Sequence, residues 1–220
     1  MSDDGVFISL EGGEGAGKTT QAKLLCAALE GAGYETLLTR EPGGTSGAEA
    51  IRELVLSGRA DKWSGMTELL LMYAARVDHV EKFIKPALSR GIWVVCDRFT
   101  DSSLAYQGYA RGLGVEKVKA VNNAVLGDFA PDLTLLFDID PVLSQKRVEN
   151  RGEALTRFDN ETLAFHKTLR TAFLEIAEQH EERIHVIDGA EDSNAIHAKV
   201  LHIITQKYPK LAGLVVPGVA

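Results

Sequence analysis

A glycine-rich stretch near the start of the chain has the residue types that could hold a phosphate group. Residues 12–19 fit the pattern G-x-x-x-x-G-K-[ST], and the apolar residues 6–10 come directly before them. Glycines let consecutive backbone N–H groups curl around a phosphate, and a helix that begins after them adds its positive end. In this pattern Lys18 reaches the β and γ phosphates, and the Thr19 hydroxyl is a ligand for Mg²⁺. This stretch, called the phosphate loop below, predicts an ATP site formed by Gly12, Gly13, Glu14, Gly15, Ala16, Gly17, Lys18 and Thr19. The alternative is a glycine-rich turn without a ligand.

A second pair of charged residues, Asp97 and Arg98, follows the apolar run at residues 92–96. At the end of a strand in a parallel sheet, a carboxylate lies beside the phosphate loop and can hold Mg²⁺ directly or through water. The planar guanidinium of Arg98 would face the same crevice, where it suits a phosphate group. The alternative is a buried ion pair without a ligand, which is a costly arrangement unless it serves a function.

Further arginines could bring positive charge to the same crevice. Arg147, Arg151 and Arg157 lie in or beside residues 150–157, a stretch with a glycine and several charges that is a candidate lid. A closing arginine can stabilise the charge that spreads over the equatorial oxygens during phosphoryl transfer. The alternative for these three is a solvated surface position. Arg76 ends an apolar helical run, so its side chain either meets a ligand in the crevice or extends to the surface.

Short apolar runs typical of buried strands alternate with helical patterns along the chain. The strand-like runs lie at residues 6–10, 35–39, 92–96, 133–137 and 184–187, and the helical patterns at 17–30, 45–57, 65–90, 101–111, 115–127, 141–150, 159–181 and 193–207. This alternation predicts an α/β fold of the P-loop NTPase kind, with a five-stranded parallel sheet, helices on both faces and a short lid. We expect one domain over residues 1–208, with the lid at about 148–158 and a C-terminal tail at 209–220.

The composition limits the partners that we expect for the protein. The chain has 220 residues and a formal net charge of −7, which argues against bulk binding to nucleic acid or to a membrane surface. No apolar run reaches the ~18 residues of a membrane span, and the acidic start of the chain does not resemble a signal peptide. Cys26 and Cys96 lie in apolar surroundings without the spacing of a zinc site. We therefore expect buried, reduced thiols and a cytoplasmic location.

Three classes of protein use a phosphate loop of this kind. A GTPase switch requires N-K-x-D and D-x-x-G motifs and a transporter ATPase requires an L-S-G-G-Q-like signature, and the chain contains none of them. A nucleotide or small-metabolite kinase requires a second anion pocket and a lid, and both are predicted here. These features favour a kinase whose acceptor carries a phosphate or a hydroxyl group, with a regulatory P-loop ATPase as the alternative.

Six segments of the chain, in order, resemble the thymidylate kinase family of the bacterial type. They are residues 11–20, 39–45, 72–76, 97–108, 131–140 and 151–158. The most specific is D-R-x-x-x-S-x-x-A-Y-Q from Asp97 to Gln107, because the phosphate loop alone does not separate the nucleotide kinases. The resemblance implies phosphorylation of dTMP to dTDP with ATP and Mg²⁺, in dTTP biosynthesis, by a homodimer. Another small acceptor or a regulatory ATPase activity stays open as the alternative.

The resemblance also implies roles for particular residues. Glu14 is expected to accept a hydrogen bond from the 3′-hydroxyl of the sugar, and Tyr106 to fill the space beneath C2′, so that ribose is excluded. Arg98, assisted by Arg52, is expected to hold the acceptor phosphate. The expected acceptor site is formed by Glu14, Arg52, Met72, Arg76 (at thymine O4), Arg98, Ser103 (at N3), Tyr106 and Gln107. The expected catalytic residues are Lys18, Arg98, Arg151 and Arg157. The expected metal ligands are Thr19 and Asp97.

Two positions depart from the pattern of the family. In one branch an arginine at position 15 reaches the transferred phosphate, whereas this chain has Gly15, so the charge is expected to come from Arg151 and Arg157 in the lid. An aromatic residue usually stands at position 72 to stack on thymine, whereas this chain has Met72, with Tyr73 beside it. A thioether can still pack on a ring, so Met72 remains in the expected site.

Overall fold

The computed structural model describes residues 5–59, 61–150, 152, 155–212 and 214, and over these residues five parallel strands form one sheet. The strand order is β2-β3-β1-β4-β5. Each strand starts within one residue of its predicted start, so the predicted parallel sheet is confirmed. The bounds are Phe7–Glu11 for β1, Thr36–Arg40 for β2, Trp93–Asp97 for β3, Leu133–Asp138 for β4 and Ile184–Asp188 for β5.

Helices connect the strands, and they follow the predicted helical patterns closely. The predicted helix over 65–90 is α3, a π-helical turn (η1) and α4 in succession, and the pattern over 101–111 is α5 continued by a second π-helical segment (η2). The bounds are Lys18–Gly31 (α1), Ser46–Leu56 (α2), Gly65–His79 (α3), Val80–Ile84 (η1), Lys85–Leu88 (α4), Thr100–Ser103 (α5), Leu104–Ala110 (η2), Val115–Leu126 (α6), Pro141–Asn150 (α7), Leu163–Glu178 (α8), Ser193–Lys207 (α9) and Pro209–Leu211 (η3, a 3₁₀ turn).

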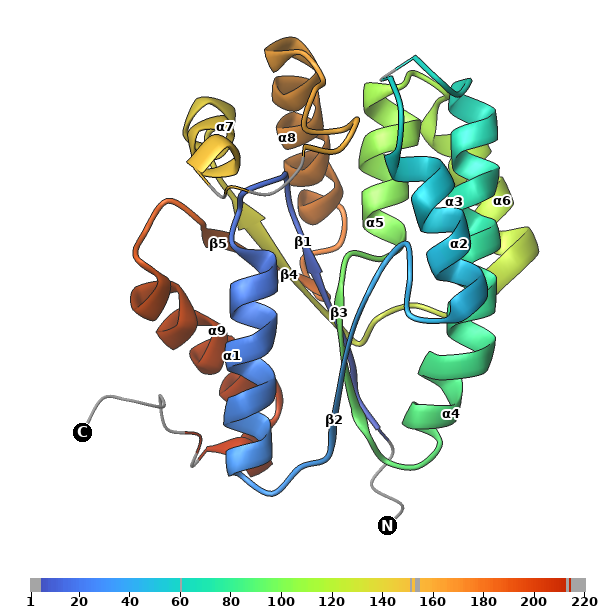
Figure 1. Cartoon of the computed structure of the whole chain (residues 1–220). Coiled ribbons are helices and arrows are strands. Elements are labelled where there is room, and N and C mark those ends of the chain that lie inside the picture. Colours follow the sequence, from blue (N-terminus) through green and yellow to red (C-terminus); the bar gives the residue numbers. More distant parts are fainter. Residues whose placement is uncertain (1–4, 60, 151, 153–154, 213, 215–220) are drawn as a thin grey trace.

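The helices cover both faces of the sheet. Figure 1 shows α1 and α9 on one side of the strands and the group from α2 to α6 on the other. Leu25 and Leu29 of α1 pack with Val200 of α9 against the first face, and all three are fully buried. Burial of a leucine or valine side chain contributes about 1.5–3 kcal/mol, so this face holds α1 firmly at the end of β1. None of the described helices combines the length and the apolar composition of a membrane span.

Helix α8 begins later than the sequence pattern suggested. The pattern predicted a helix from residue 159, whereas α8 begins at Leu163 because the Thr162 side chain accepts a hydrogen bond from the Phe165 backbone N–H at 3.2 Å. Before it, the Asp159 carboxylate accepts from the backbone N–H and the hydroxyl of Thr156, at 2.7 and 2.6 Å. Such local side-chain bonds compete with the helix, which explains the delayed start.

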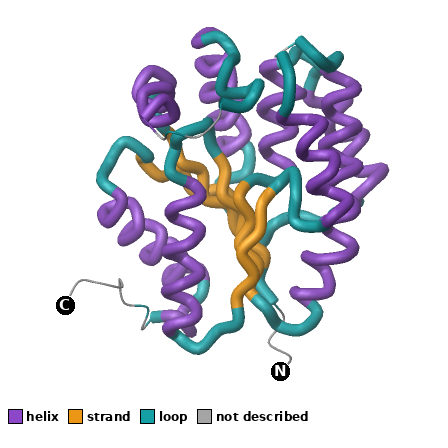
Figure 2. The backbone as a smooth tube through the Cα atoms, in the orientation of Figure 1, coloured by secondary structure: helices purple, strands orange, loops and turns teal. Residues whose placement is uncertain are grey.

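The strand register brings three loops together at one end of the sheet. Asp97 of β3 lies opposite both Leu10 of β1 and Arg40 of β2. The backbone N–H of Glu41 donates to the Asp97 carbonyl at 3.0 Å, and that of Arg98 donates to the Leu10 carbonyl at 2.9 Å. The segments that follow β1, β2 and β3 therefore meet at the carboxyl ends of these strands, where Figure 2 shows the loops.

Candidate active site

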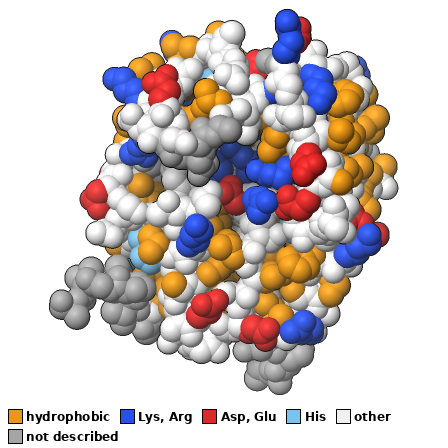
Figure 3. Space-filling model, viewed as in Figure 1, with side chains coloured by type: hydrophobic (Ala, Val, Ile, Leu, Met, Phe, Trp, Pro, Cys, Tyr) orange, Lys and Arg blue, Asp and Glu red, His pale blue; other side chains and the backbone are white. Residues whose placement is uncertain are grey.

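A cleft of about 660 Å³ opens at this end of the sheet. Figure 3 shows Lys and Arg side chains gathered in the central hollow of the molecule, with acidic side chains beside them. The phosphate loop, the turn after β2, helices α2 and α3, the β3–α5 connection and the stretch before α8 all contribute to the walls. Of the predicted site residues, those that line the cleft are Glu14, Gly15, Gly17, Lys18, Thr19, Arg52, Met72, Asp97, Arg98, Tyr106 and Gln107.

Two glycines of the phosphate loop occupy positions where a side chain would collide. Gly12 has a φ of 134°, and a Cβ atom there would lie 2.5 Å from the Phe137 carbonyl oxygen. Gly15 has a φ of 69°, and its Cβ atom would lie 2.7 Å from the Ser144 carbonyl oxygen. The loop is thus packed tightly against β4 and α7, and a side chain at position 15 would require the backbone around Ser144 to shift.

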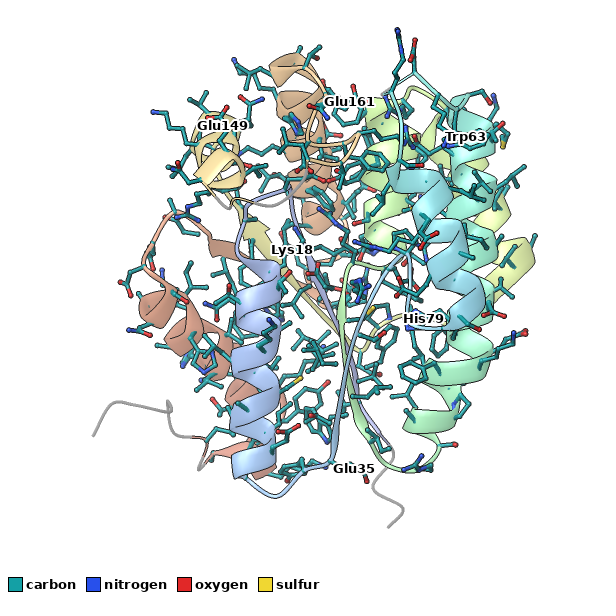
Figure 4. The ribbon with its side chains drawn as sticks, in the orientation of Figure 1. Lys18, Glu35, Trp63, His79, Glu149 and Glu161 are labelled. Atoms are coloured by element: carbon teal, nitrogen blue, oxygen red, sulfur yellow. The ribbon has the colours of Figure 1, made fainter. Side chains whose placement is uncertain are left out.

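Lys18 lies at the first position of α1, at the centre of Figure 4, with 6% of its surface exposed. Its Nζ donates to the carbonyl oxygens of Gly13 and Gly12 at 2.6 and 3.1 Å. Burial, together with the charge of Arg98, lowers the pKa of Lys18 to about 8. A phosphate group in the cleft would counter both effects and hold the ammonium in its charged form.

Thr19 and Asp97 meet beside the phosphate loop. The Thr19 hydroxyl donates to the Asp97 carboxylate at 2.6 Å, and both residues line the cleft. Both side chains offer oxygen atoms, which are the ligands that Mg²⁺ prefers. No group of three or more His, Cys, Asp or Glu side chains in the described part of the chain could hold a metal. A pair of side-chain oxygens fits Mg²⁺ that obtains its other ligands from nucleotide phosphates and water.

Arg98 has an unusual backbone conformation for a residue with a side chain, with a φ of 75°. Its guanidinium donates to the Gly12 carbonyl at 2.8 Å, to the Ser102 hydroxyl at 3.2 Å and to Glu14 Oε1 at 3.1 Å. Burial alone would lower the pKa of Arg98, but the neighbouring Tyr106 and Glu14 raise it above its usual range. A permanently charged guanidinium is therefore held at the cleft, and backbone strain of this kind is concentrated at functional sites.

Glu14, inside the phosphate loop, joins this cluster. Its Oε1 atom accepts a hydrogen bond from the Tyr106 hydroxyl at 2.5 Å as well as the one from Arg98. Burial would raise the pKa of Glu14, but the charges of Arg98 and Lys18 outweigh it and lower the pKa. The carboxylate is therefore ionised, and it can accept a hydrogen bond from a ligand hydroxyl.

Sequence analysis missed Glu11, the last residue of β1, which organises the segment around Arg98. Its Oε1 accepts from the backbone N–H groups of Phe99 and Ser102 at 2.7 and 3.3 Å, and its Oε2 accepts from the Ser102 hydroxyl at 2.6 Å. The Glu11 carboxylate thus ties the start of α5 to the end of β1, with Arg98 between them. An acidic residue that ends an apolar run was the available signal.

Glu11 should also make the free energy of unfolding depend on pH. Burial, with the nearby Asp101 carboxylate, raises the pKa of Glu11 from 4.5 to about 7, against the opposing charge of Arg98. Between about pH 4.5 and 7 the unfolded chain ionises while the folded carboxyl keeps its proton, so Glu11 lowers stability as the pH rises, by roughly 3 kcal/mol at most. In denaturant titrations at pH 5 and 7.5, Glu11→Gln should lose less stability with rising pH than the wild type. Equal losses in both proteins would contradict this assignment.

Met72 and Tyr73 are neighbours in the sequence and are both candidates for contact with the base, but the structure places them differently. Met72 lines the cleft, whereas the Tyr73 hydroxyl donates to Asn122 of α6 at 3.1 Å and its ring is buried outside the cleft. Of the two, only Met72 lines the cleft, and its packing against a base stays a prediction. Gln107 also lines the cleft and donates to Glu68 at 2.7 Å.

Arg76 and Ser103 lie together, as expected, but deep in the protein. The Arg76 guanidinium donates to the Ser103 hydroxyl at 2.9 Å, to Glu41 at 2.5 Å and to the Phe99 carbonyl at 3.0 Å. Glu41 also lies 3.1 Å from His79, whose position Figure 4 labels. Neither Arg76 nor Ser103 lines the cleft, so their contacts with a thymine base stay predictions.

Arg52 and Arg147 lie at the edges of the cleft with backbone partners. Arg52 donates to the Pro42 carbonyl at 2.7 Å. Arg147 donates to the carbonyls of Gly189 and Ala190, at 2.7 and 3.2 Å. Both side chains are therefore fixed at the walls of the cleft, where they add positive charge.

Arg157 is placed differently from our expectation. Its side chain is 1% exposed, and it donates to the Glu68 carboxylate and to the Val55 carbonyl instead of pointing into the cleft. In this arrangement Arg157 ties the segment before α8 to α2 and α3, and its catalytic role stays a prediction. Arg151, the other expected lid arginine, lies outside the described residues, and its catalytic role stays a prediction.

Comparisons of the sequence and the structure with known proteins all identify the same family. The family model described as thymidylate kinase matches residues 10–200. The chain is 48% identical over 203 residues to a thymidylate kinase from Caulobacter vibrioides, covering 92% of this chain and 97% of that protein. It is 43% identical over 207 residues to one from Bacillus pumilus, covering 94% and 98%. The crystal structure of thymidylate kinase from Ehrlichia chaffeensis matches with a TM-score of 0.74 and 33% identity, over 91% of this chain and 99% of that one.

Proposed function

The chain belongs to the thymidylate kinase family, and we propose that the cleft at the carboxyl end of its sheet is where it phosphorylates dTMP to dTDP with ATP as the donor. One observation supports the assignment of this reaction to the cleft. The phosphate-loop residue Lys18 and the cluster of Arg98, Glu14 and Tyr106 line the same hollow. A donor phosphate and an acceptor phosphate can therefore lie close together between two fixed cations.

The transfer itself requires positioning and charge neutralisation. The backbone N–H groups of the phosphate loop and Lys18 would hold the β and γ phosphates of ATP. Arg98 would bind the phosphate of dTMP, whose oxygen is already anionic and needs no base to attack. The positive charges on both sides oppose the repulsion between two phosphate groups, which lowers the barrier to their approach.

The metal that accompanies ATP would be held by Thr19 and Asp97. Their oxygen atoms line the cleft next to Lys18, and they suit Mg²⁺ in number and kind. When bound, Mg²⁺ would neutralise charge on the β and γ phosphates. The hydrogen bond between the Thr19 hydroxyl and the Asp97 carboxylate keeps the oxygen atoms of both side chains on the side of the cleft where ATP would bind.

The acceptor sugar would lie against the hydrogen-bonded pair of Glu14 and Tyr106. The Glu14 carboxylate would accept a hydrogen bond from the 3′-hydroxyl, and the Tyr106 ring, held by its bond to Glu14, would fill the space beneath C2′. Met72 and Gln107 line the adjoining wall, where the base would lie. Arg52 and Arg98 remain the proposed ligands of the acceptor phosphate.

Removal of the tyrosine ring should relax the choice of sugar. Tyr106→Ala opens space beneath C2′, so we expect UMP to gain at least tenfold in kcat/KM relative to dUMP, since a removed steric clash is worth about 1–3 kcal/mol. Steady-state kinetics with this pair of acceptors measures the ratio, and dTMP reports the general loss of activity. A ratio equal to that of the wild type would remove Tyr106 from this role.

We further propose a homodimer in the cytoplasm, with residues 1–208 as a single kinase domain. Figure 3 shows hydrophobic side chains on the flank formed by α2 and α3, and Leu54 and Leu70 on these helices are exposed. An exposed apolar flank of this kind suits an interface between subunits. Light scattering would measure the mass, and Leu70→Glu should shift it toward a monomer.

An acceptor panel tests the proposed function. ADP release from ATP and Mg²⁺ would be measured with dTMP, dUMP, UMP, dCMP, AMP and shikimate. We expect dTMP to give the highest kcat/KM. Faster turnover with another member of the panel would reassign the acceptor.

A further inference from the structure

The two carboxylate oxygens of Glu14 have very different surroundings. Oε1 accepts hydrogen bonds from Tyr106 and Arg98, whereas Oε2 is buried and accepts none from the residues that the structure describes. The imidazole of His166 faces this second oxygen, with its Nδ1 atom 3.8 Å from Oε2. A buried carboxylate oxygen without a donor is uncommon and requires an explanation.

His166 is itself an unusual residue. It lies on α8, is 7% exposed, and its Nε2 atom has no hydrogen-bond partner among the described residues. It lines a small cavity of about 20 Å³ directly behind the phosphate loop, with Gly12, Gly13 and Asp138. That volume holds about one water molecule. The cavity therefore leaves free space beside the imidazole, so the ring is not packed tightly on every side.

The same helix also fixes the aromatic wall of the proposed sugar site. The rings of Phe165 and Phe173 lie 6.2 and 6.3 Å from the ring of Tyr106, centre to centre. Because α8 holds both His166 and the surroundings of Tyr106, it places the imidazole on one side of Glu14 and the phenol on the other. A shift of less than 1 Å would bring Nδ1 and Oε2 to an ordinary hydrogen-bond distance.

We propose that His166 is a positioning residue, which donates from Nδ1 to Glu14 Oε2 and so holds the carboxylate in the orientation in which it meets the 3′-hydroxyl of the acceptor sugar. This inference rests on the proposed function, because it deepens the role of Glu14 in binding dTMP. With Oε2 held by the imidazole, the carboxylate cannot rotate away from the sugar. His166 thus contributes to the preference for an acceptor that carries a 3′-hydroxyl, although it does not touch the substrate.

The first test compares dTMP with 3′-deoxythymidine monophosphate, which lacks the hydroxyl. His166→Phe removes both ring nitrogens at similar size, and we expect it to raise KM for dTMP about fivefold to tenfold while KM for the 3′-deoxy analogue stays within twofold. His166→Asn restores a donor near the position of Nδ1, so it should return KM for dTMP to within about twofold of the wild type. An equal rise for both acceptors in His166→Phe, or a failure of the asparagine to rescue, would overturn the inference.

A second measurement separates this inference from the proposed function. In ¹⁵N NMR spectra of the full chain, the His166 imidazole nitrogens should shift when Glu14 is replaced by Gln, whichever acceptor the enzyme uses. Glu182→Gln, which alters an exposed carboxylate near a different histidine, is the control and should leave these signals unchanged. His166 signals that ignore Glu14→Gln would overturn the positioning role. The His166 signals could respond to Glu14→Gln while the wild type has equal KM values for dTMP and its 3′-deoxy analogue. That result would contradict the proposed placement of the sugar against Glu14, and not the contact between His166 and Glu14.

Discussion

Replacement of Arg98 by alanine is expected to lower kcat/KM for dTMP by about 10³-fold, because a positioned arginine in phosphoryl transfer is worth at least that much. The guanidinium is held by Gly12, Ser102 and Glu14, and it lines the cleft beside Lys18. The variant loses the charge that opposes the repulsion between donor and acceptor phosphates. Steady-state kinetics with varied dTMP measures the effect.

The backbone at this position requires a second variant. Since the φ of Arg98 is 75°, alanine keeps the strained conformation, whereas Arg98→Gly relieves it. Both variants should lose activity equally if the side chain is responsible. Arg90→Ala, which removes an exposed arginine paired with Glu35, is the matched control and should retain wild-type kinetics. A near-normal rate in Arg98→Gly would show that the loss in the alanine variant comes from the backbone.

The second large effect concerns stability. Arg157→Ala should lower the free energy of unfolding by about 3–5 kcal/mol, because it leaves the fully buried Glu68 carboxylate without its main counter-charge. Arg111 and Gln107 still donate to Glu68, but Arg111 shares its charge with Glu161. Denaturant titration measures the loss. The kcat of the folded fraction should remain within a few-fold of the wild type.

A double variant checks the cause of this loss. Glu68→Gln removes the buried charge and keeps an oxygen for Gln107 and Arg111, so adding it to Arg157→Ala should recover part of the lost stability. The opposite pattern would be an Arg157→Ala protein that unfolds like the wild type but has lost kcat by 100-fold or more. That pattern would support the catalytic role that the sequence suggested for Arg157.

The sequence predicted most of the fold and the position of the phosphate loop, because both are encoded locally. The apolar runs define the strands, and the spacing of Gly12, Gly17, Lys18 and Thr19 defines a loop whose shape depends on its own backbone. Asp97 and Arg98 were also found, since charged residues that directly follow a buried strand must lie at its carboxyl end. In each case neighbouring residues in the sequence are neighbours in the site.

The parts that the sequence did not predict depend on partners far apart in the chain. Arg157 and Glu68 are 89 residues apart, and an arginine near a lid looks the same in the sequence whether it meets a phosphate or a buried carboxylate. Glu68 within the apolar run of α3 was a signal for a buried ion pair, but it did not identify the partner. His166 gave no signal, because a single histidine on a helix is compatible with many positions in a fold.

Transfer of label from [γ-³²P]ATP in a single turnover tests the central claim most directly, since it follows the phosphoryl group itself. The enzyme would be mixed with Mg²⁺, labelled ATP and an excess of dTMP, and the products separated by chromatography. Phosphoryl transfer in the cleft predicts that the label appears in dTDP, and that Lys18→Ala and Arg98→Ala both slow its appearance. Label released as inorganic phosphate at a rate that dTMP does not change would contradict the account, because it would identify the protein as an ATPase.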